Sequence, residues 1–180
     1  MELNSYIDHT NLKQIGTLKD IEKLCNEAIK YHFASVCVPP YYVTLAKKLL
    51  KGSTVAVCTV IGFPNGYSTK DEIEEIRDAI DGYILKVIIE TCYLEKEEIT
   101  KMTEICNETF VNFIKTSTGF GTSGANIEDL KIINEHKNDI LEIKASGGIK
   151  TLDDAEKFIK AGATRLGTSN GVSIMEGEIK

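Results

Sequence analysis

Residues 85–90 have the sequence Leu-Lys-Val-Ile-Ile-Glu, in which charged side chains interrupt a run of β-branched residues. In an extended strand, alternation places Lys86 and Glu90 on one face and three apolar side chains on the other. Residues 141–144, Leu-Glu-Ile-Lys, repeat this pattern. An open sheet covered by helices on both faces would bury such charges at a high cost, whereas the interior of a barrel lets opposite charges meet. The pattern therefore favours a (β/α) barrel, with Lys86, Glu90 and Glu142 forming an ion-pair network inside it.

Strand-like runs alternate with segments of helical period along the whole chain, which is typical of a parallel sheet with crossover helices. The expected strands are Tyr6–Asp8, Ser35–Val38, Val55–Ile61, Leu85–Thr91, Asn112–Thr116, Leu141–Ala145 and Thr164–Gly167. Helix starts are indicated by a capping residue with an acid three positions on, at Thr17/Asp20, Thr69/Glu72, Asn126/Asp129 and Thr151/Asp154. We expect a single α/β domain over residues 1–180, a TIM-barrel-like (β/α) barrel shortened to about seven strands instead of eight.

The 180 residues include 21 basic and 27 acidic side chains, a formal net charge of −6. Both signs are interspersed, so no basic field would attract nucleic acid or an anionic membrane. No apolar run reaches the roughly 18 residues of a spanning helix, and the amino-terminal residues lack the regions of a signal peptide. We therefore expect a cytoplasmic protein with a small-molecule substrate. The sequence leaves the oligomeric state open, with a homodimer as the assembly to test.

The cysteines and histidines give no sign of a bound metal or cofactor. The five cysteines form no C-x-x-C pair. His9, His32 and His136 are far apart in the sequence and form no cluster with the spacing of metal ligands. We expect no metal and no other cofactor.

Two lysines stand at the carboxyl ends of neighbouring expected strands. Lys115 is followed by Thr116–Gly119, and Lys144 is followed by Ala145–Gly148. Carboxyl ends of parallel strands meet at the catalytic face of such a fold. A desolvated amine beside a second cation loses its proton more easily, and the neutral amine can attack a carbonyl to form a Schiff base. The alternative is that each lysine pairs with an acid such as Glu142.

Glycine-rich segments follow the last two expected strands, at 147–151 and 167–171, and each leads into a helix. Backbone N–H groups at a helix start suit a phosphate group, and barrels often bind phosphate after their last strands. The alternative is that these glycines only form tight turns. A further glycine segment, 119–124, fits G-x-G-x-x-G and leaves an NAD-dependent oxidoreductase as a competing hypothesis. The acid that should close the following strand is missing there, because Glu142 lies inside it.

The chain resembles the deoxyribose-phosphate aldolases, a family of class I aldolases. The resemblance rests on Tyr6–Thr10, Ala34–Val38, Val55–Pro64, Lys86–Cys92, Phe113–Phe120, Ile143–Ile149 and Arg165–Ser169. It implies a (β/α)₈ barrel that reversibly cleaves 2-deoxy-D-ribose 5-phosphate to acetaldehyde and D-glyceraldehyde 3-phosphate.

The resemblance also implies roles for individual residues. Lys115 matches the Schiff-base lysine, Lys144 matches the second lysine that assists it, and Asp8 matches a catalytic residue that lines the pocket. The positions implied in substrate and phosphate binding are Cys37, Thr116, Gly119, Gly147, Gly148, Gly167 and Ser169.

One segment of the family pattern is absent. The family carries a further helix and strand between the segment that ends at Pro64 and the strand that begins at Lys86, about 30 residues. The aspartate on that strand joins the second lysine in proton transfer. Its loss leaves a second hypothesis open, in which this chain binds a sugar phosphate with little turnover, and Asp8 or Glu90 are the residues that could replace the aspartate.

Overall fold

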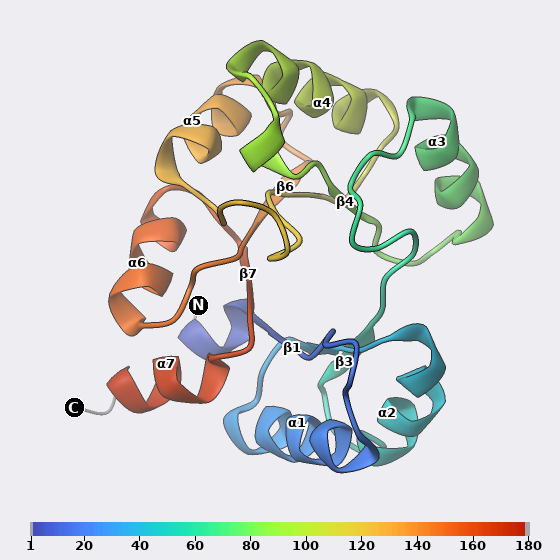
Figure 1. Ribbon diagram of the computed structural model, residues 1–180, viewed down its shortest axis with the longest axis vertical. Coiled ribbons are helices and arrows are strands. Elements are labelled where there is room, and N and C mark those ends of the chain that lie inside the picture. The colour runs from blue at the N-terminus through green and yellow to red at the C-terminus, as the bar shows by residue number, and fades with distance from the viewer. Residues whose placement is uncertain (1, 179–180) are drawn as a thin grey trace. The chain divides into compact units, whose positions relative to one another are not determined.

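The computed structural model describes residues 2–178 of the chain. Strands and α-helices alternate along it (Figure 1). The strands are β1 (Ile7–Thr10), β2 (Ser35–Cys37), β3 (Ala56–Cys58), β4 (Lys86–Ile88), β5 (Phe113–Lys115), β6 (Glu142–Ser146) and β7 (Arg165–Thr168). The α-helices are α1 (Leu18–Tyr31), α2 (Val43–Leu49), α3 (Lys70–Ala79), α4 (Lys96–Glu108), α5 (Ile127–His136), α6 (Leu152–Lys160) and α7 (Gly171–Glu178), and the short 3₁₀ helices are η1 (Leu3–Tyr6), η2 (Pro40–Tyr42) and η3 (Thr91–Tyr93).

The chain divides into two compact units. The first unit comprises Met1–Ile61, Ile149–Glu156 and Arg165–Lys180, and the second unit comprises Gly62–Gly148 and Lys157–Thr164.

The first unit contains a parallel sheet of strand order β3-β2-β1-β7. Helix α1 packs on β1 and β2, and α2 packs on α1 and β3 (Figure 1). The contact surface of α1 is the apolar stripe expected from the sequence, with Ile21, Leu24 and Ala28 buried. The start of α1 is a capping box, because the Thr17 side chain accepts from the Asp20 N–H while the Asp20 carboxylate accepts from the Thr17 N–H.

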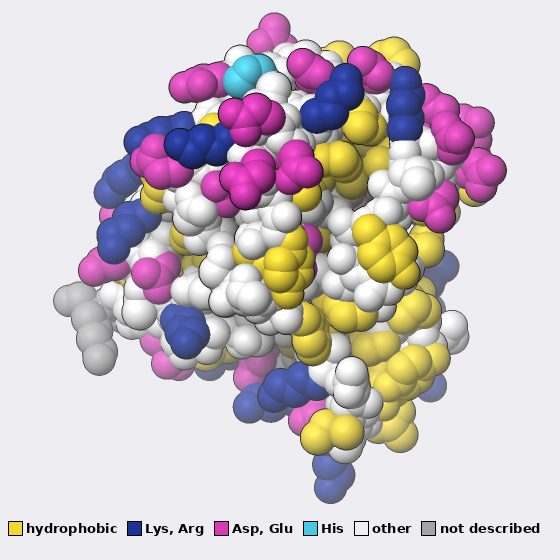
Figure 2. All heavy atoms as spheres, turned by 45° about the horizontal axis from the view of Figure 1, so that its top comes forward, with side chains coloured by type: hydrophobic (Ala, Val, Ile, Leu, Met, Phe, Trp, Pro, Cys, Tyr) yellow, Lys and Arg dark blue, Asp and Glu magenta, His cyan; other side chains and the backbone are white. Residues whose placement is uncertain are grey.

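The second unit contains a parallel sheet of strand order β6-β5-β4. Helices α4 and α5 pack against each other, α4 contacts β5, and α5 contacts β6. Their buried residues include Ile99 and Cys106 on α4 and Leu130 and Ile133 on α5. Figure 2 shows acidic and basic side chains interspersed over the face that α3, α4 and α5 form, as the sequence predicted, and no basic patch gathers on this face.

All seven expected strands are present, although most are shorter than expected because the chain turns away soon after the paired residues. The strand expected to extend to Thr91 ends at Ile88, since Glu90 adopts a left-handed conformation with φ 50° and ψ 64°. The four expected helix starts are also confirmed, with side-chain caps at Thr17, Thr69, Asn126 and Thr151.

The expected buried network of Lys86, Glu90 and Glu142 is wrong. Glu142 is exposed at the amino end of β6, where its carboxylate accepts a hydrogen bond from the Thr164 hydroxyl at 2.7 Å. Glu90 is buried beyond the other end of β4, where its carboxylate bonds to Thr118. The two acids therefore lie at opposite ends of the second unit's sheet and do not share a cluster.

No helix between residues 2 and 178 combines the length and the apolarity needed to cross a membrane.

Candidate active site

Lys115 and Lys144 are direct register partners on the adjacent parallel strands β5 and β6. Register partners on neighbouring parallel strands lie about 4.8 Å apart and project their side chains to the same face. Both side chains are buried, with 6% of Lys115 and 2% of Lys144 exposed to solvent. The two lysines are therefore neighbours on adjacent strands, as predicted, and Lys115 ends β5 as expected. The prediction that Lys144 ends its strand is wrong, because β6 continues through Ala145 to Ser146.

Hydrogen bonds among small polar residues hold the carboxyl ends of β5 and β6 together. The Thr116 N–H donates to the Lys144 carbonyl at 3.1 Å, and the Ser146 N–H donates to the Thr116 hydroxyl at 3.2 Å. The Ser146 hydroxyl donates to the Ser117 carbonyl at 2.5 Å. Thr116, Ser117 and Ser146 are all buried, so these bonds satisfy polar groups that water does not reach. They fix the backbone that directly follows the two lysines.

The glycines that follow β5 and β6 adopt conformations that other residues avoid. Gly119 has φ 88°, and Gly147 and Gly148 each have φ 81°. A Cβ on Gly124 would lie 2.2 Å from the Gly147 carbonyl oxygen, so the loop after β5 touches the backbone after β6. The G-x-G-x-x-G pattern therefore has a packing explanation in this structure.

An aromatic side chain lies near the Lys115 amine. The Lys115 Nζ is 5.9 Å from the centre of the Phe63 ring. The Phe63 ring also meets the Phe120 ring edge to face, with 5.6 Å between ring centres. The Phe63 ring thus forms an apolar wall next to this amine, which the sequence did not indicate because Phe63 is 52 positions away along the chain.

The remaining expected site residues belong to the first unit. Asp8 is buried on β1, where it pairs in register with Ser35 and Gly167, and its carboxylate accepts from the Ser35 hydroxyl at 2.7 Å. Cys37 is buried at the end of β2. Ser169 is exposed just after β7.

His9 is a buried titratable side chain next to these residues on β1. Its Nε2 lies 2.9 Å from the Glu27 carboxylate. Burial lowers the pKa of His9, although its hydrogen bond with Glu27 acts in the opposite direction. Within the described part of the chain, no group of three or more His, Cys, Asp or Glu side chains could hold a metal ion.

Two features of the site were missed by the sequence analysis. One is the hydroxyl network of Thr116, Ser117 and Ser146, and the other is the contact between Glu90 and Thr118. The sequence did carry a signal for the hydroxyl network, because Lys115 and Lys144 are each followed within two residues by serine or threonine. No local pattern indicates the second, because its two residues come from different strand ends.

No family model matches the chain, but individual proteins resemble it over nearly its whole length. It is 43% identical to a deoxyribose-phosphate aldolase from Treponema denticola, over 99% of this chain and 100% of the relative. It is 46% identical to one from Clostridioides difficile, over 96% of this chain and 94% of the relative.

Solved structures agree with these relatives. The chain aligns with the aldolase QR15 at a TM-score of 0.92 and 34% identity, over 99% of this chain and 96% of the other. It aligns with a tetrameric deoxyribose phosphate aldolase from Aeropyrum pernix at a TM-score of 0.91 and 25% identity, over 99% and 91% of the two chains. The chain therefore has a shortened TIM-barrel-like α/β fold.

The length of the alignment shows that this chain lacks positions that its relative has. The alignment with the Treponema denticola protein runs over 216 positions, whereas this chain has 180 residues, a difference of at least 36 (216 − 180). This agrees with the expected loss of about one helix and strand. In the sheets, β3 pairs only with β2 and β4 only with β5, so each strand has an open edge among the described pairings.

Proposed function

Because the chain belongs to the deoxyribose-phosphate aldolase family, we propose that it catalyses the reversible aldol cleavage of 2-deoxy-D-ribose 5-phosphate to acetaldehyde and D-glyceraldehyde 3-phosphate. The observation that carries this proposal is the register pairing of two buried lysines, Lys115 and Lys144. Two buried lysines paired in register on adjacent strands suit Schiff-base chemistry, because burial and a neighbouring cation both favour an uncharged amine.

In the proposed reaction, the neutral Lys115 amine attacks the aldehyde carbon of the open-chain sugar, and water leaves to form an imine. Loss of the proton from the C3 hydroxyl then lets the bond between C2 and C3 break, and the electron pair moves into the imine to give an enamine. D-glyceraldehyde 3-phosphate departs. Protonation of the enamine and hydrolysis release acetaldehyde and restore the amine. Lys144 is the proposed cationic neighbour and proton-transfer group.

In this proposal Asp8 has a catalytic role, and the remaining expected site residues bind the substrate. Asp8 assists proton transfer in the pocket, and its carboxylate is held by Ser35. We assign Cys37 and Thr116 to substrate contacts. The phosphate is assigned to the glycine-rich segments, at Gly119, Gly147, Gly148, Gly167 and Ser169. Positive φ angles at three of these glycines support close approach of the backbone to an anion.

Borohydride trapping tests the proposed nucleophile. The chain is incubated with acetaldehyde and sodium borohydride, and peptide mass spectrometry then locates any ethylated lysine. We expect the ethyl group on Lys115 and its loss in Lys115→Ala. Lys131→Ala is the matched control, because Lys131 is an exposed lysine of α5 paired with Glu128. An adduct that persists in Lys115→Ala contradicts the assignment.

Lys144→Ala tests the role of the second lysine. Removal of the cationic neighbour should slow imine formation on Lys115 by roughly 10²–10⁴-fold, the usual range for lost acid–base assistance. The rate of borohydride-trapped adduct formation measures this effect. A trapping rate equal to that of the unaltered chain contradicts a role for Lys144.

A second candidate function is binding of the sugar phosphate with little turnover, which the absence of at least 36 aligned positions from this chain favours. A spectrophotometric assay that reduces the released D-glyceraldehyde 3-phosphate with coupled enzymes separates the two. Turnover together with the adduct supports the aldolase, and an adduct without turnover supports binding alone. The oxidoreductase hypothesis has lost its support, because the glycines at 121 and 124 are explained by packing.

Residues 1–180 are proposed to act as one aldolase domain, which is supported by relatives that align with 99% of the chain. The proposed location is the cytoplasm, where the five free cysteines would stay reduced. A homodimer is the proposed assembly, and light scattering would distinguish it from a monomer or from a tetramer such as that of the Aeropyrum pernix aldolase.

A further inference from the structure

Glu90 is a buried acid in an unusual backbone conformation. It lies just beyond the end of β4 with φ 50° and ψ 64°, and only 3% of it is exposed. A positive φ is uncommon for a residue other than glycine, and a buried carboxylate is costly unless it is hydrogen bonded. Contacts of the Glu90 side chain must therefore offset the cost of its backbone conformation and of its buried carboxylate.

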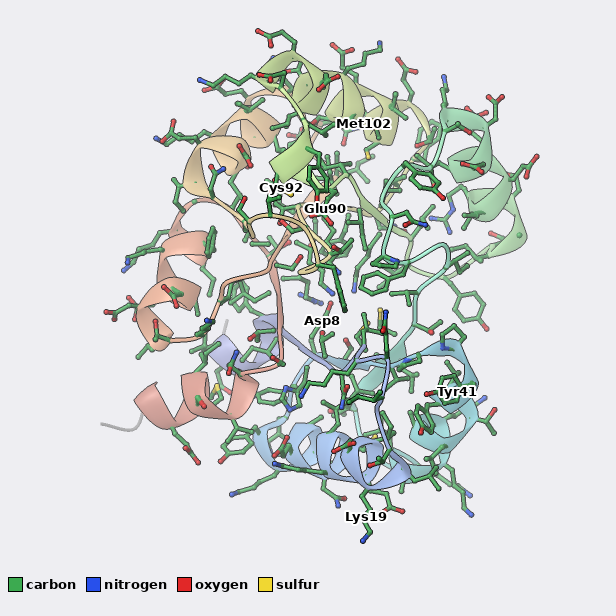
Figure 3. All side chains as sticks on the ribbon, viewed as in Figure 1. Asp8, Lys19, Tyr41, Glu90, Cys92 and Met102 are labelled. Atoms are coloured by element: carbon green, nitrogen blue, oxygen red, sulfur yellow. The ribbon has the colours of Figure 1, made fainter. Side chains whose placement is uncertain are left out.

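The Glu90 carboxylate binds the loop that follows β5. The Thr118 N–H lies 3.2 Å from each carboxylate oxygen, and the Thr118 hydroxyl donates to Oε2. The Cys92 thiol is a weaker donor, 3.8 Å from Oε1, and Figure 3 shows Cys92 and Glu90 near each other in the second unit. All these partners are donors, which suits an ionised carboxylate because it can only accept.

Thr118 connects Glu90 to Lys115, the proposed Schiff-base residue, because it lies three positions after Lys115 in the chain. Its hydroxyl also accepts from the Phe120 N–H at 3.0 Å. The neighbouring Thr91 N–H donates to the Thr116 carbonyl at 2.9 Å. The loop segment 116–120 is therefore attached to the residues that follow β4 at two points, Thr116 and Thr118.

The loop packs directly on Glu90 and Cys92. A Cβ on Gly121 would lie 2.5 Å from the Cys92 Sγ and 3.1 Å from the Glu90 Oε1. The backbone of Gly121 thus closes over the buried carboxylate. This contact leaves no room for a side chain at position 121.

The geometry points to Glu90 as a positioning residue that holds loop 116–121, and with it the Lys115 amine, in the arrangement that imine formation requires. The inference rests on the proposed aldolase function and deepens it. Since the donors of Thr118 and Cys92 occupy its carboxylate, Glu90 acts through the loop and does not replace the missing proton-relay aspartate. A displacement of about 1 Å in such a site can cost a hundredfold in rate.

Glu90→Gln is the first test, because glutamine has the same size but turns one acceptor oxygen into a donor that faces the donors of Thr118. We expect the trapping rate of acetaldehyde on Lys115 to fall about 10- to 100-fold. For cleavage of deoxyribose 5-phosphate, kcat should fall much more than KM changes. Glu142→Gln is the matched control, because that acid is exposed and bonds only to a threonine outside the loop, Thr164.

Thr118→Val and Thr118→Ser separate positioning from a general loss of structure. Thr118→Val removes the hydroxyl and should slow trapping, whereas Thr118→Ser keeps the hydroxyl and should restore most of the rate. The double variant Glu90→Gln/Thr118→Val should be hardly slower than Glu90→Gln alone, because both changes break one contact. Circular dichroism and melting temperatures identify any variant that fails to fold. If Glu90→Gln does not fold, the comparison of Thr118→Val with Thr118→Ser tests the inference.

The possible outcomes separate this inference from the proposed function. Absence of an adduct on Lys115 in the unaltered chain contradicts the aldolase proposal, and the inference fails with it. An adduct in the unaltered chain that forms equally fast in Glu90→Gln overturns the inference and leaves the aldolase proposal intact. Effects of Glu90→Gln and Thr118→Val that multiply in the double variant also overturn it, because they would show that Glu90 does not act through Thr118.

Discussion

Replacement of Gly124 by alanine should destabilise the second unit, because the added Cβ would collide with the backbone of Gly147. The added Cβ would lie 2.2 Å from the Gly147 carbonyl oxygen and 2.3 Å from its carbonyl carbon. Carbon and oxygen atoms that are not bonded to each other approach to about 3.3 Å at the closest, so the loop must move by roughly 1 Å. Both partners are backbone, which leaves no flexible side chain to give way.

This movement would break the hydrogen bonds that follow Gly124. The Ala125 N–H donates to the Ser146 carbonyl at 2.9 Å and to the Gly147 carbonyl at 3.3 Å. Loss of each bond costs about 0.5–1.5 kcal/mol. Together with the strain of forced packing, we expect a loss of about 2–3 kcal/mol in the free energy of unfolding. In a chain of this size, that corresponds to a fall of about 4–12 °C in melting temperature.

Thermal and urea unfolding followed by circular dichroism measure the effect of Gly124→Ala. The matched control is Gly16→Ala, because a Cβ on Gly16 would meet its nearest neighbour at an ordinary 3.6 Å. The control should stay within about 0.5 kcal/mol of the unaltered chain. If Gly124→Ala melts at the same temperature as this control, the close approach of Gly124 to Gly147 is not a feature of the folded protein.

Two further predictions concern titratable groups. Burial raises the pKa of Cys25 to about 11 and of Cys106 to about 12. At pH 8, a thiol reagent should therefore modify the half-buried Cys58 and Cys92 first. Rapid labelling of Cys106 in the native chain would contradict its burial. Burial lowers the pKa of His9 in the folded chain. As the pH falls, the unfolded chain therefore takes up a proton on this side chain near pH 6.5, before the folded chain does. The free energy of unfolding should consequently fall as the pH drops below about 6.5. Urea unfolding between pH 7.5 and pH 5.5 measures this change in the free energy of unfolding. In His9→Gln, the free energy of unfolding should depend less on pH. If it depends on pH as strongly as in the unaltered chain, other groups cause the change.

The elements of the fold could be predicted because their signals are local. The Thr69 capping box depends on residues three positions apart, and the apolar stripe of α1 depends on spacings of three and four. The alternation of residues 85–90 likewise needs only the strand period of two. Strand ends were predicted less well, because the turn at Glu90 depends on its contacts with Thr118, which local sequence does not encode.

The candidate site was only partly predictable for the same reason. The placement of Lys115 and Lys144 on neighbouring strands was visible in the sequence, whereas their register pairing and the extension of β6 beyond Lys144 appear only in the structure. The environment of Lys115 was not visible, because Phe63 reaches it from a distant segment. The burial of Glu142 was predicted wrongly, since alternation assigns a face of a strand but not how far that end of the strand extends into solvent.

The amino-acid order alone thus establishes the alternation of strands and helices, the helix starts, the two lysines on neighbouring strands and the likeness to an aldolase family. Each depends on residues that are close along the chain or on motifs in a fixed order. Folding decides which strands pair, why Gly124 must be glycine and which loop Glu90 holds. Those features depend on atoms that meet through space, and packing and hydrogen bonding select them only once the distant segments have come together.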